Sequence, residues 1–354
     1  MIEIIPIEKS EFWDKVVLSF TNYDVYYLSG YVKAFQIHGA GEPLLIYYKS
    51  DDLRGICVLM KRDISQDNRF KSFLPENTYF DVVTPYGYGG FVFEGDMSIK
   101  NINRFSEKYI EILNSENIIS TFYRFHPQLG NASYLRSIID VVELGRTIVL
   151  DLDSETIIWN NISSKNRNAI RGAQKKEVII KHGKSKDLFE HFIEIYNSTM
   201  AKDKADSYYF FGLDFYESLR TDLKDNFEIF FAEHFGKIVA IAIILYANGR
   251  LHYHLSGSIF EYRHLSPSNL LLFEVALWGS KNGFKTFHLG GGLGSGEDNL
   301  FKFKKAFNRN SGLQFSVGKE ICNLEKYNYL VQLRKEKSFE FKTDSSFFPL
   351  YRAQ

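Results

Sequence analysis

The sequence has few of the residues that would place it in a specialised class. It contains only two cysteines among 354 residues, Cys57 and Cys322, and neither belongs to a Cys-x-x-Cys pair or a metal-ligand spacing. This excludes a disulfide framework and gives no indication of a metal site, and it is typical of free thiols in a reducing cytoplasm. No window holds the roughly 18 apolar residues of a spanning helix, and the N-terminal segment MIEIIPIEKS is unlike a signal peptide. We therefore expect a cytoplasmic protein without a transmembrane segment, able at most to contact a membrane surface peripherally.

An excess of one charge sign is also missing. Lys and Arg number 43, as do Asp and Glu, so the net charge is zero and any nucleic-acid contact must come from a local patch. Aromatic residues, by contrast, are abundant, with 22 Tyr and 32 Phe. A chain of this length and composition is large enough for two domains with substantial cores.

The order of the predicted elements indicates an α/β (α+β) protein whose second half repeats the plan of the first. In both halves a pair of helices precedes a β-hairpin, and a further helix and strand follow. In the first half these are helices within 11–38, a hairpin at 41–64, a strand near 80–90, a helix at 98–116 and a strand at 119–129. In the second half they are a strand at 147–152, a basic helix from Ser163 or Ser164, helices at 187–200 and 215–223, hairpin strands at 227–257, a helix at 267–282 and a strand at 284–290. A helix from about Asp298 and a charged helical end from about 320 complete the chain.

The stretch HLGGGLGSGEDNLFKFKKAF (288–307) combines glycines, acids and interleaved lysines. Its glycines do not fit Gly-x-Gly-x-x-Gly in any register, and KHGKS at 181–185 lacks the earlier glycine of a phosphate-binding loop, since Val178 stands there. Both nucleotide-loop interpretations fail. The glycines predict a tight strand-to-helix turn, because glycine permits positive φ and a close backbone approach.

A lysine next to this turn is the strongest functional candidate. On a helix from Asp298, the side chains of Leu300, Phe303 and Phe307 share one face. Lys304 lies beside that face, whereas Lys302 and Lys305 point away. A lysine can pack its stem on apolar neighbours while its ammonium reaches into a cleft, which favours a functional role for Lys304.

The helix that begins near Ser163 carries a basic ridge. Arg167, Arg171 and Lys175 recur every four residues, and residues 163–186 contain eight bases and one acid, Glu177. A guanidinium fork binds two phosphate oxygens at once, so we expect Arg167 and Arg171 to bind phosphate groups. A solvated helix face is the alternative interpretation.

Two further segments offer ligand-binding groups. In TPYGYGG (84–90), Tyr86 and Tyr88 either pack in a rigid turn or present a hydroxyl and a ring face to a ligand. In SPSN (266–269), Pro267 suits the first turn of a helix and Ser266 or Ser268 its cap, and such an N-terminus can hold a phosphate or carboxylate.

His252 and His254 alternate on a strand, but no third metal ligand is apparent, so they are interpreted as strand histidines.

The chain resembles the FemABX family of non-ribosomal peptidyltransferases, within the GNAT-like acyltransferase superfamily. The resemblance covers most of the chain. Six motifs carry it: TPYGYGG at 84–90, RFHP at 124–127, KNRNAIRGAQKK at 165–176, YNSTMAKDKADSYYF at 196–210, SPSNLLLFEVALWGSKNG at 266–283 and LGGGLGSGEDNLFKFKKAF at 289–307.

This resemblance implies two tandem GNAT-like domains with a ligand cleft between them. Residues 1–150, completed by 320–354, would form the first domain, and residues 151–319 the second, with the LGGG and FK motifs. It also implies amide formation by transfer of an amino acid from aminoacyl-tRNA, without a permanently bound cofactor. The acceptor would be a nucleotide- or lipid-linked muramyl peptide of peptidoglycan biosynthesis.

The family pattern also suggests roles for individual residues. Phe303 and Lys304 match its Phe-Lys pair at the donor end, where the lysine would stabilise the departing ester or the oxyanion. The remaining motifs add substrate-binding candidates: Lys202, Ser268, Asn269, Gly291 and Gly292, beside Arg167, Arg171, Tyr86 and Tyr88. For the general base, Asp298, Glu297 and Asp81 are candidates, and deprotonation assisted by the substrate is as plausible.

The chain also departs from related patterns. It has no insertion long enough for the helical arm of some FemABX members. The usual GNAT pyrophosphate loop is absent before the helix at 267–282, which weakens an acyl-CoA donor. Two alternatives therefore stay open: an acyl-CoA-dependent N-acyltransferase acting on an amino sugar of a surface polysaccharide, and a non-catalytic binding protein of the same fold.

Overall fold

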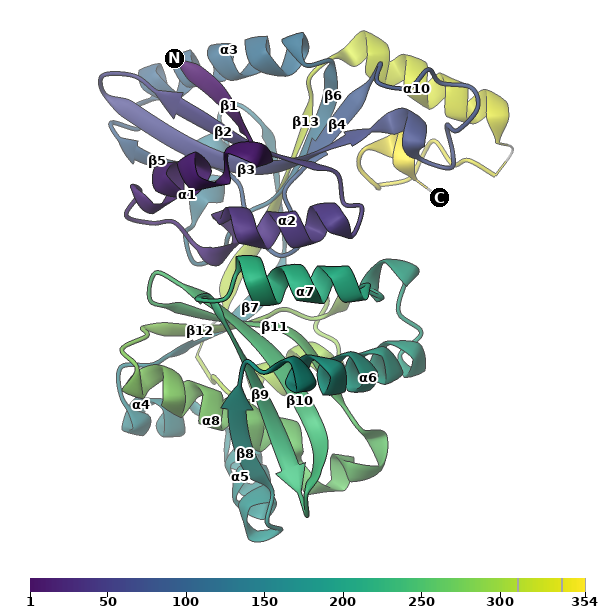
Figure 1. Cartoon of the computed structure of the whole chain (residues 1–354). Coiled ribbons are helices and arrows are strands. Elements are labelled where there is room, and N and C mark those ends of the chain that lie inside the picture. The colour runs from purple at the N-terminus through teal and green to yellow at the C-terminus, as the bar shows by residue number, and fades with distance from the viewer. Residues whose placement is uncertain (311, 339, 354) are drawn as a thin grey trace. The chain divides into compact units, whose positions relative to one another are not determined.

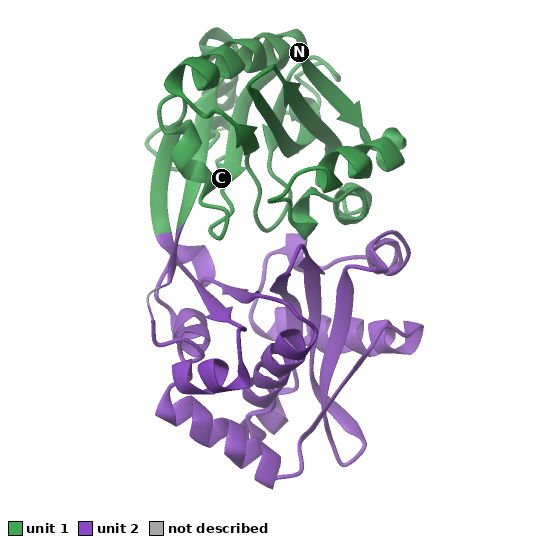
Figure 2. Ribbon diagram, turned by 90° about the vertical axis from the view of Figure 1, so that its left-hand side faces the viewer, with its two compact units in different colours: residues 1–144, 315–354 green, residues 145–314 purple. Residues whose placement is uncertain are grey.

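The computed structural model describes residues 1–310, 312–338 and 340–353, and it divides into two compact units (Figure 2). Unit 1 comprises residues 1–144 and 315–354, and unit 2 comprises residues 145–314. The divisions fall a few residues before the predicted limits at 150 and 319. Strand β7 (Asp140–Asp151) carries the chain out of unit 1, and β13 (Leu313–Ile321) returns it.

Unit 1 is a mixed sheet with helices packed against it (Figure 1). Its strands follow the order β1-β2-β3-β4-β6-β13, and β5 pairs with β3. The strands are β1 (Ile2–Pro6), β2 (Glu42–Lys49), β3 (Leu53–Asp63), β4 (Phe80–Val83), β5 (Val92–Gly95) and β6 (Ile118–Arg124). The helices are α1 (Ser10–Leu18), α2 (Ser29–Ile37), α3 (Ile99–Ser115) and α10 (Leu324–Lys337).

Unit 2 has the same kind of sheet, in the order β8-β9-β10-β11-β12-β7. Its other strands are β8 (Ile179–Gly183), β9 (Phe227–His234), β10 (Lys237–Ala247), β11 (Arg250–Ser258) and β12 (Thr286–Gly290). Its helices are α4 (Glu155–Asn161), α5 (Ser164–Lys175), α6 (Lys186–Lys202), α7 (Leu213–Asp222), α8 (Pro267–Lys281) and α9 (Asn299–Lys305). The 3₁₀ segment η6 (Phe260–Leu265) precedes α8.

The two units repeat one strand pattern. Along each sheet the first three pairings are antiparallel, the fourth is parallel (β4 with β6, β11 with β12) and the last is antiparallel. A helix, α3 or α8, connects the two parallel strands, as a parallel connection requires. In unit 1 the last strand, β13, comes from the C-terminal part of the chain, and in unit 2 it is β7, which precedes the rest of that unit. The repeat of helices, hairpin, helix and strand expected from the sequence is therefore a repeat of topology.

The hydrophobic pattern explains why unit 2 has helices on both faces of its sheet. β10 reads KIVAIAIILYA and is buried along almost its whole length, as expected of a central strand covered on both faces. α8 starts with Pro267 at the first helical position, where a missing N–H costs nothing, and nine of its residues are buried. Phe301 and Phe307, on and beside α9, belong to the same core.

Several elements were not predicted. β1, β8 and α4 were missed, and β7 begins at Asp140 rather than at 147. The predicted helical end from about 320 is α10, which begins only at Leu324, after β13. β13 was missed because its pairing partner in unit 1, β6, lies almost two hundred residues earlier in the chain, so no local pattern indicates it.

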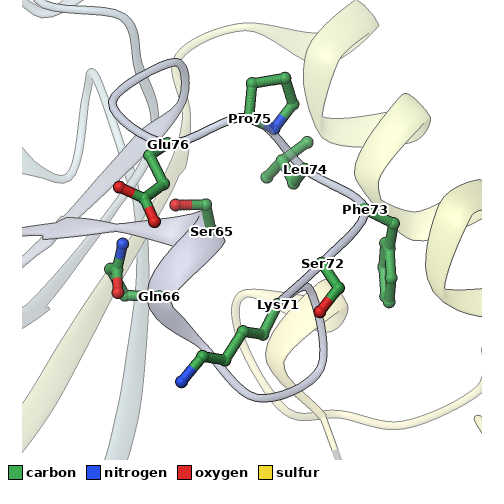
Figure 3. A pocket seen from close by; sticks show the side chains of 8 residues that line it. All are labelled: Ser65, Gln66, Lys71, Ser72, Phe73, Leu74, Pro75 and Glu76. Carbon is green, nitrogen blue, oxygen red and sulfur yellow. The ribbon is translucent and has the colours of Figure 1, made fainter.

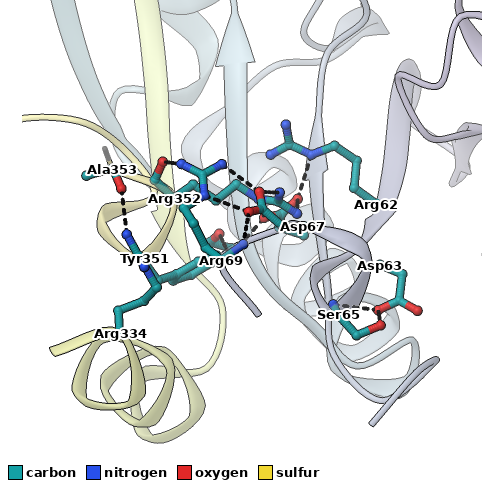
Figure 4. Close-up of polar contacts among 11 residues, drawn as sticks. Arg62, Asp63, Ser65, Asp67, Arg69, Arg334, Tyr351, Arg352 and Ala353 are labelled. Carbon is teal, nitrogen blue, oxygen red and sulfur yellow. Dashed lines mark hydrogen bonds and ion pairs between the residues drawn. The ribbon is translucent and has the colours of Figure 1, made fainter. Parts of the chain in front are cut away.

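The end of the chain is held on unit 1 by buried ion pairs (Figure 4). The Arg352 guanidinium contacts both carboxylate oxygens of Asp81, and its Nη1 lies 2.6 Å from Oδ2 of Asp67. Arg62 Nε donates to Asp81 Oδ1 at 2.7 Å, and the Tyr351 hydroxyl donates to Asp81 Oδ2 at 3.1 Å. Burial raises the pKa of Asp81, but the two arginines outweigh it and hold that pKa below its ordinary value. Asp81 is thus a buried carboxylate held by ion pairs in the C-terminal anchor, and nothing in these contacts supports the predicted alternative of a general base.

A pocket of about 460 Å³ lies in unit 1 at residues 65–76 (Figure 3). Ser65, Lys71 and Glu76 are among the residues that line it, and none of the predicted site residues does. Among the helices of the described residues, none combines the length and the apolar character that crossing a membrane demands.

Candidate active site at the glycine turn

The turn between β12 and α9 depends on glycine at two positions. Gly290 has φ +77°, in the left-handed region that other residues rarely adopt. At Gly292 a Cβ would lie 2.2 Å from the Gly296 carbonyl oxygen and 2.4 Å from Asp298 Oδ1. No side chain fits there, so the backbone of the turn packs directly on the start of α9.

Asp298 is the N-cap of α9. Its Oδ1 accepts a hydrogen bond from Phe301 N at 2.8 Å, and its Oδ2 accepts one from Leu293 N at 3.3 Å. The Phe301 bond, the Leu293 bond and the charge of Lys304 together lower the pKa of Asp298. An anion at a helix N-terminus satisfies backbone donors that would otherwise have no partner. Asp298 therefore fixes the turn to the helix as a carboxylate, which is a weak general base.

Lys304 is a buried cation in this turn. Its side chain is 8% exposed, and Nζ donates to the Gly291 carbonyl oxygen at 2.7 Å. Burial lowers the pKa of Lys304 to about 8, and the nearby Asp298 carboxylate partly opposes this effect. An ammonium group has three donors, and Gly291 takes one. The other two have no acceptor among the described residues.

The other side chains of α9 differ in part from the prediction. Phe307 is fully buried, and Phe303 is half-buried with its ring 5.5 Å from that of Phe307. The expected member Leu300 is instead 37% exposed, and Phe301 takes the buried place. The helix starts at Asn299, and its buried side follows Phe301 and Lys304 at a spacing of three. Lys302 is exposed, and Lys305 Nζ donates to the Asn310 carbonyl.

The basic ridge on α5 lies close in the fold to the end of α9. Ser163 N, at the start of α5, donates to the Ala306 carbonyl oxygen at 2.9 Å. The guanidinium groups of Arg167 and Arg171 lie over the Trp159 ring, 5.9 and 5.0 Å from its centroid. Among the described residues neither arginine forms an ion pair with a carboxylate. The contact with the indole ring orients both guanidinium groups, and their N–H groups can still bind anions.

The SPSN segment joins the same region through an amide pair. Asn269 Nδ2 donates to Asn166 Oδ1 at 2.7 Å, which links the first turn of α8 to α5. Asn166 is 3% exposed, and its Nδ2 is buried without a partner among the described residues. Ser266, one of the two predicted caps, has φ +54° and makes no capping hydrogen bond with its side chain. Ser268 lies inside α8, half-buried.

The tyrosines of TPYGYGG lie in an aromatic cluster of unit 1. Tyr86 stacks on Phe35 with ring centroids 5.7 Å apart, and its carbonyl oxygen accepts a hydrogen bond from the Tyr31 hydroxyl at 2.6 Å. The Tyr88 ring lies 5.7 Å from that of His126, and burial raises the pKa of Tyr88 far above its ordinary value. Both side chains are half-buried. Their packing agrees with the rigid-turn interpretation, and their binding role stays a prediction.

Lys202 stands apart from these groups at the end of α6. Its Nζ lies 4.3 Å from the Phe260 ring centroid and 3.9 Å from Asp203 Oδ1. Neither contact tests the predicted role of Lys202 in substrate binding, which stays a prediction.

Sequence reasoning missed two buried polar pairs. In unit 1, His126 Nε2 lies 3.0 Å from Asp24 Oδ2, and both side chains are fully buried. In unit 2, His252 and His288 are register partners on β11 and β12, with ring centroids 5.8 Å apart. The RFHP motif contains His126, but its partner Asp24 lies about a hundred residues earlier in the chain. His252 and His288 become neighbours only when β11 and β12 pair in the sheet.

Comparison with known proteins agrees with this architecture. Residues 161–304 match the acetyltransferase (GNAT) domain family. The structure is similar to the crystal structure of FemX, with a TM-score of 0.66 at 14% identity over 93% of this chain and 99% of FemX. No protein of curated function matches the sequence significantly.

Two further solved structures share the fold. The C-terminal domain of a putative lysylphosphatidylglycerol synthetase from Agrobacterium fabrum has a TM-score of 0.54 at 12% identity, over 88% of this chain and 91% of that one. A tandem GNAT protein from the clavulanic acid biosynthesis pathway has a TM-score of 0.50 at 9% identity, over 91% and 99%. The chain is thus a protein with the GNAT-type acyltransferase fold. The overall fold is like that of FemX, which confirms the predicted fold class and the predicted likeness.

Proposed function

We propose that this chain transfers an aminoacyl group from aminoacyl-tRNA to an amine of a peptidoglycan precursor peptide. The observation that carries the proposal is the buried Lys304 ammonium, held by Gly291 beside the Asp298 carboxylate. The motif resemblance to FemABX transferases and the FemX-like fold support the substrate class.

In this reaction the amine attacks the ester carbonyl, and negative charge develops on the carbonyl oxygen. The carbon–oxygen bond to the ribose then breaks, the ribose oxygen takes a proton, and the amide remains. Lys304 supplies the positive charge at the oxyanion or at the departing oxygen. A fixed cation in a site with little water stabilises such charge strongly, because the surroundings need not reorganise.

The other residues of the site bind and position the substrates. Arg167 and Arg171, stacked on Trp159, hold phosphate groups of the donor or of a nucleotide-linked acceptor. Asp298 orients the turn and Lys304, and the attacking amine loses its proton to the substrate or to solvent. The fixed backbone at Gly291 and Gly292 forms the wall next to the reacting ester.

The test is incubation with a mixture of charged tRNAs and a nucleotide-linked muramyl peptide, with the product measured by mass spectrometry. We expect a mass increase of one amino-acid residue on the peptide. Thermal unfolding with and without coenzyme A distinguishes an acyl-CoA donor from aminoacyl-tRNA. Only a ligand that binds the folded chain raises its unfolding midpoint. Protection by coenzyme A without any mass increase would favour an acyl-CoA-dependent N-acyltransferase. Protection by the muramyl peptide without turnover of any acyl donor would favour a binding protein.

A further inference from the structure

Two tight turns of the same type in unit 2 differ in the first of their two central residues. The β9–β10 turn is His-Phe-Gly-Lys, with φ +47° at Phe235 and +78° at Gly236. The β10–β11 turn is Ala-Asn-Gly-Arg, with φ +47° at Asn248 and +75° at Gly249. Positive φ at both central residues is the pattern of a type I′ hairpin turn, for which Asn-Gly is a preferred pair.

Phe235 therefore occupies a position that suits asparagine. A bulky side chain rarely adopts this backbone conformation, since Cβ approaches the following carbonyl oxygen. The side chain gains nothing from burial in return, because Phe235 is 79% exposed. The strain and the exposure both oppose folding of the isolated chain. A surface outside this molecule that takes up the ring would compensate for the strain and the exposure.

Other rings and cations surround this turn. The ring centroids of Phe235 and His234 lie 4.4 Å apart, and those of His234 and Tyr262 lie 6.1 Å apart. Lys237 Nζ lies 5.2 Å from the Tyr262 centroid. Phe260, in the same 3₁₀ segment as Tyr262, is 55% exposed.

Phe260 has two cations near its ring. Lys202 Nζ is 4.3 Å and the Arg263 guanidinium 5.2 Å from its ring centroid. Lys176 Nζ, from the end of α5, donates to the His264 carbonyl oxygen at 2.8 Å. We call this surface the aromatic tip; its members are Lys202, Phe235, Lys237, Phe260, Tyr262 and Arg263.

We propose that the aromatic tip docks unit 2 on the surface of an anionic phospholipid bilayer. Exposed aromatic rings are favourable at the boundary between headgroups and acyl chains, and neighbouring basic side chains reach the anionic headgroups. The chain has no net charge overall, so this attraction is local to the tip, and because Lys202 lies 3.9 Å from Asp203 Oδ1 it comes mainly from Lys237 and Arg263. Two exposed rings, Phe260 with two cations near its ring and Phe235 two residues before Lys237, fit a headgroup layer.

Vesicle sedimentation tests this without any acyl donor, so the result is independent of the proposed enzymatic reaction. The purified chain is mixed with vesicles of phosphatidylcholine alone or of phosphatidylcholine with phosphatidylglycerol. We expect binding only to the anionic vesicles. The variant Phe235→Asn should weaken binding about tenfold, because it removes the ring that the bilayer would bury. Its unfolding midpoint should be equal to or above that of the original chain, because Asn suits the turn.

The charge part of the proposal has its own variant pair. The double change Lys237→Gln with Arg263→Gln should weaken binding by about thirtyfold, from about a fivefold effect for each cation. The matched controls are on α3 of unit 1: Ile99→Asn, where the side chain is 73% exposed, and Lys100→Gln with Lys108→Gln. These should bind as the original chain does. Absence of binding to both vesicle types, as a protein partner at this surface would give, overturns the proposal. Unchanged binding of the Phe235→Asn variant also overturns it.

Discussion

The Nζ atom of Lys304 lies 2.7 Å from the carbonyl oxygen of Gly291, thirteen residues earlier in the chain. This contact holds the amine of a buried lysine against the glycine turn that connects β12 to α9. The Asp298 cap at the start of the same helix adds a compensating negative charge. A cation kept in a fixed place at this cost is suited to charge that appears only during a reaction.

Replacement of this amine should reduce the reaction more than it reduces stability. We expect Lys304→Met to lower the transfer rate by about a hundredfold or more, since a positioned charge at an oxyanion is worth that much. The measurement is the initial rate of the mass increase. Lys302→Met, on the exposed side of the same helix, is the matched control and should keep the rate. Full activity of a folded Lys304→Met variant would remove Lys304 from the mechanism.

The pH dependence follows from the pKa of Lys304, which burial lowers to about 8. Below pH 8 the side chain is charged, and its contribution to the rate should be complete. Above pH 8 the charge is lost, and this contribution should fall. In the unfolded chain the pKa is higher, so between about 8 and 10.5 the unfolded state binds more protons. The free energy of unfolding should therefore rise with pH in that window, as the rate falls. A rate that is constant from pH 7 to 10 would contradict a role for the ammonium.

Two substitutions at Asp298 separate its two roles. Asp298→Ala removes the cap and should lower the free energy of unfolding by about 1 kcal/mol. Asp298→Asn retains a capping oxygen but removes the charge, so stability should change less while the pKa of Lys304 falls further. The Lys304 pKa is measured by NMR titration of its ε-methylene, which needs no substrate. If the pKa were unaffected in Asp298→Asn, electrostatic coupling of the two residues would be disproved.

Glu320 on β13 makes unit 1 sensitive to pH. Its Oε2 is buried and has no partner among the described residues, and burial raises the pKa of Glu320 to about 7. Between pH 4.5 and 7 the folded state therefore binds more protons than the unfolded state. The stability that this proton gives is complete below pH 4.5 and is lost as the pH rises through 7.

Glu320→Gln should remove this dependence and raise the free energy of unfolding at pH 8 by up to about 3 kcal/mol. Chemical denaturation at pH 5 and pH 8 measures the effect. A variant with the same slope between the two pH values as the original chain would show that Glu320 is not the titrating group.

The C-terminal anchor should matter for stability and not for chemistry. Arg352→Met leaves Asp81 and Asp67 without their shared cation, and loss of one partner of a buried pair costs about 3 kcal/mol. Arg136→Met, which breaks an exposed pair with Glu143, should cost well under 1 kcal/mol. Thermal and denaturant unfolding compare the two variants. Equal losses would mean that the Asp81 cluster adds little to the stability of unit 1.

The amino-acid sequence alone determined the α/β class, the doubled order of elements and the lysine of interest. These depend on local signals: hydrophobic periodicity, Pro267 and Asn282 at the ends of α8, and a Phe-Lys pattern that places one lysine among apolar side chains. The start of α9 at Asp298 was predicted, but its buried side was placed one residue off, at Leu300 instead of Phe301, because packing on the core of unit 2 decides which side of a seven-residue helix is buried.

Only the tertiary structure decided the rest, because those features join residues far apart in the chain. Three examples are the pairing of β13 with β6, the contact of Asp24 with His126, and the ion pair of Asp81 with Arg352. Each depends on contacts that no local window of the sequence contains. The same is true of Lys304: the sequence places the amine on a helix, but its burial and its bond to Gly291 arise only when the glycine turn folds back on that helix. Packing decides which charges are buried, and burial is what changes their chemistry.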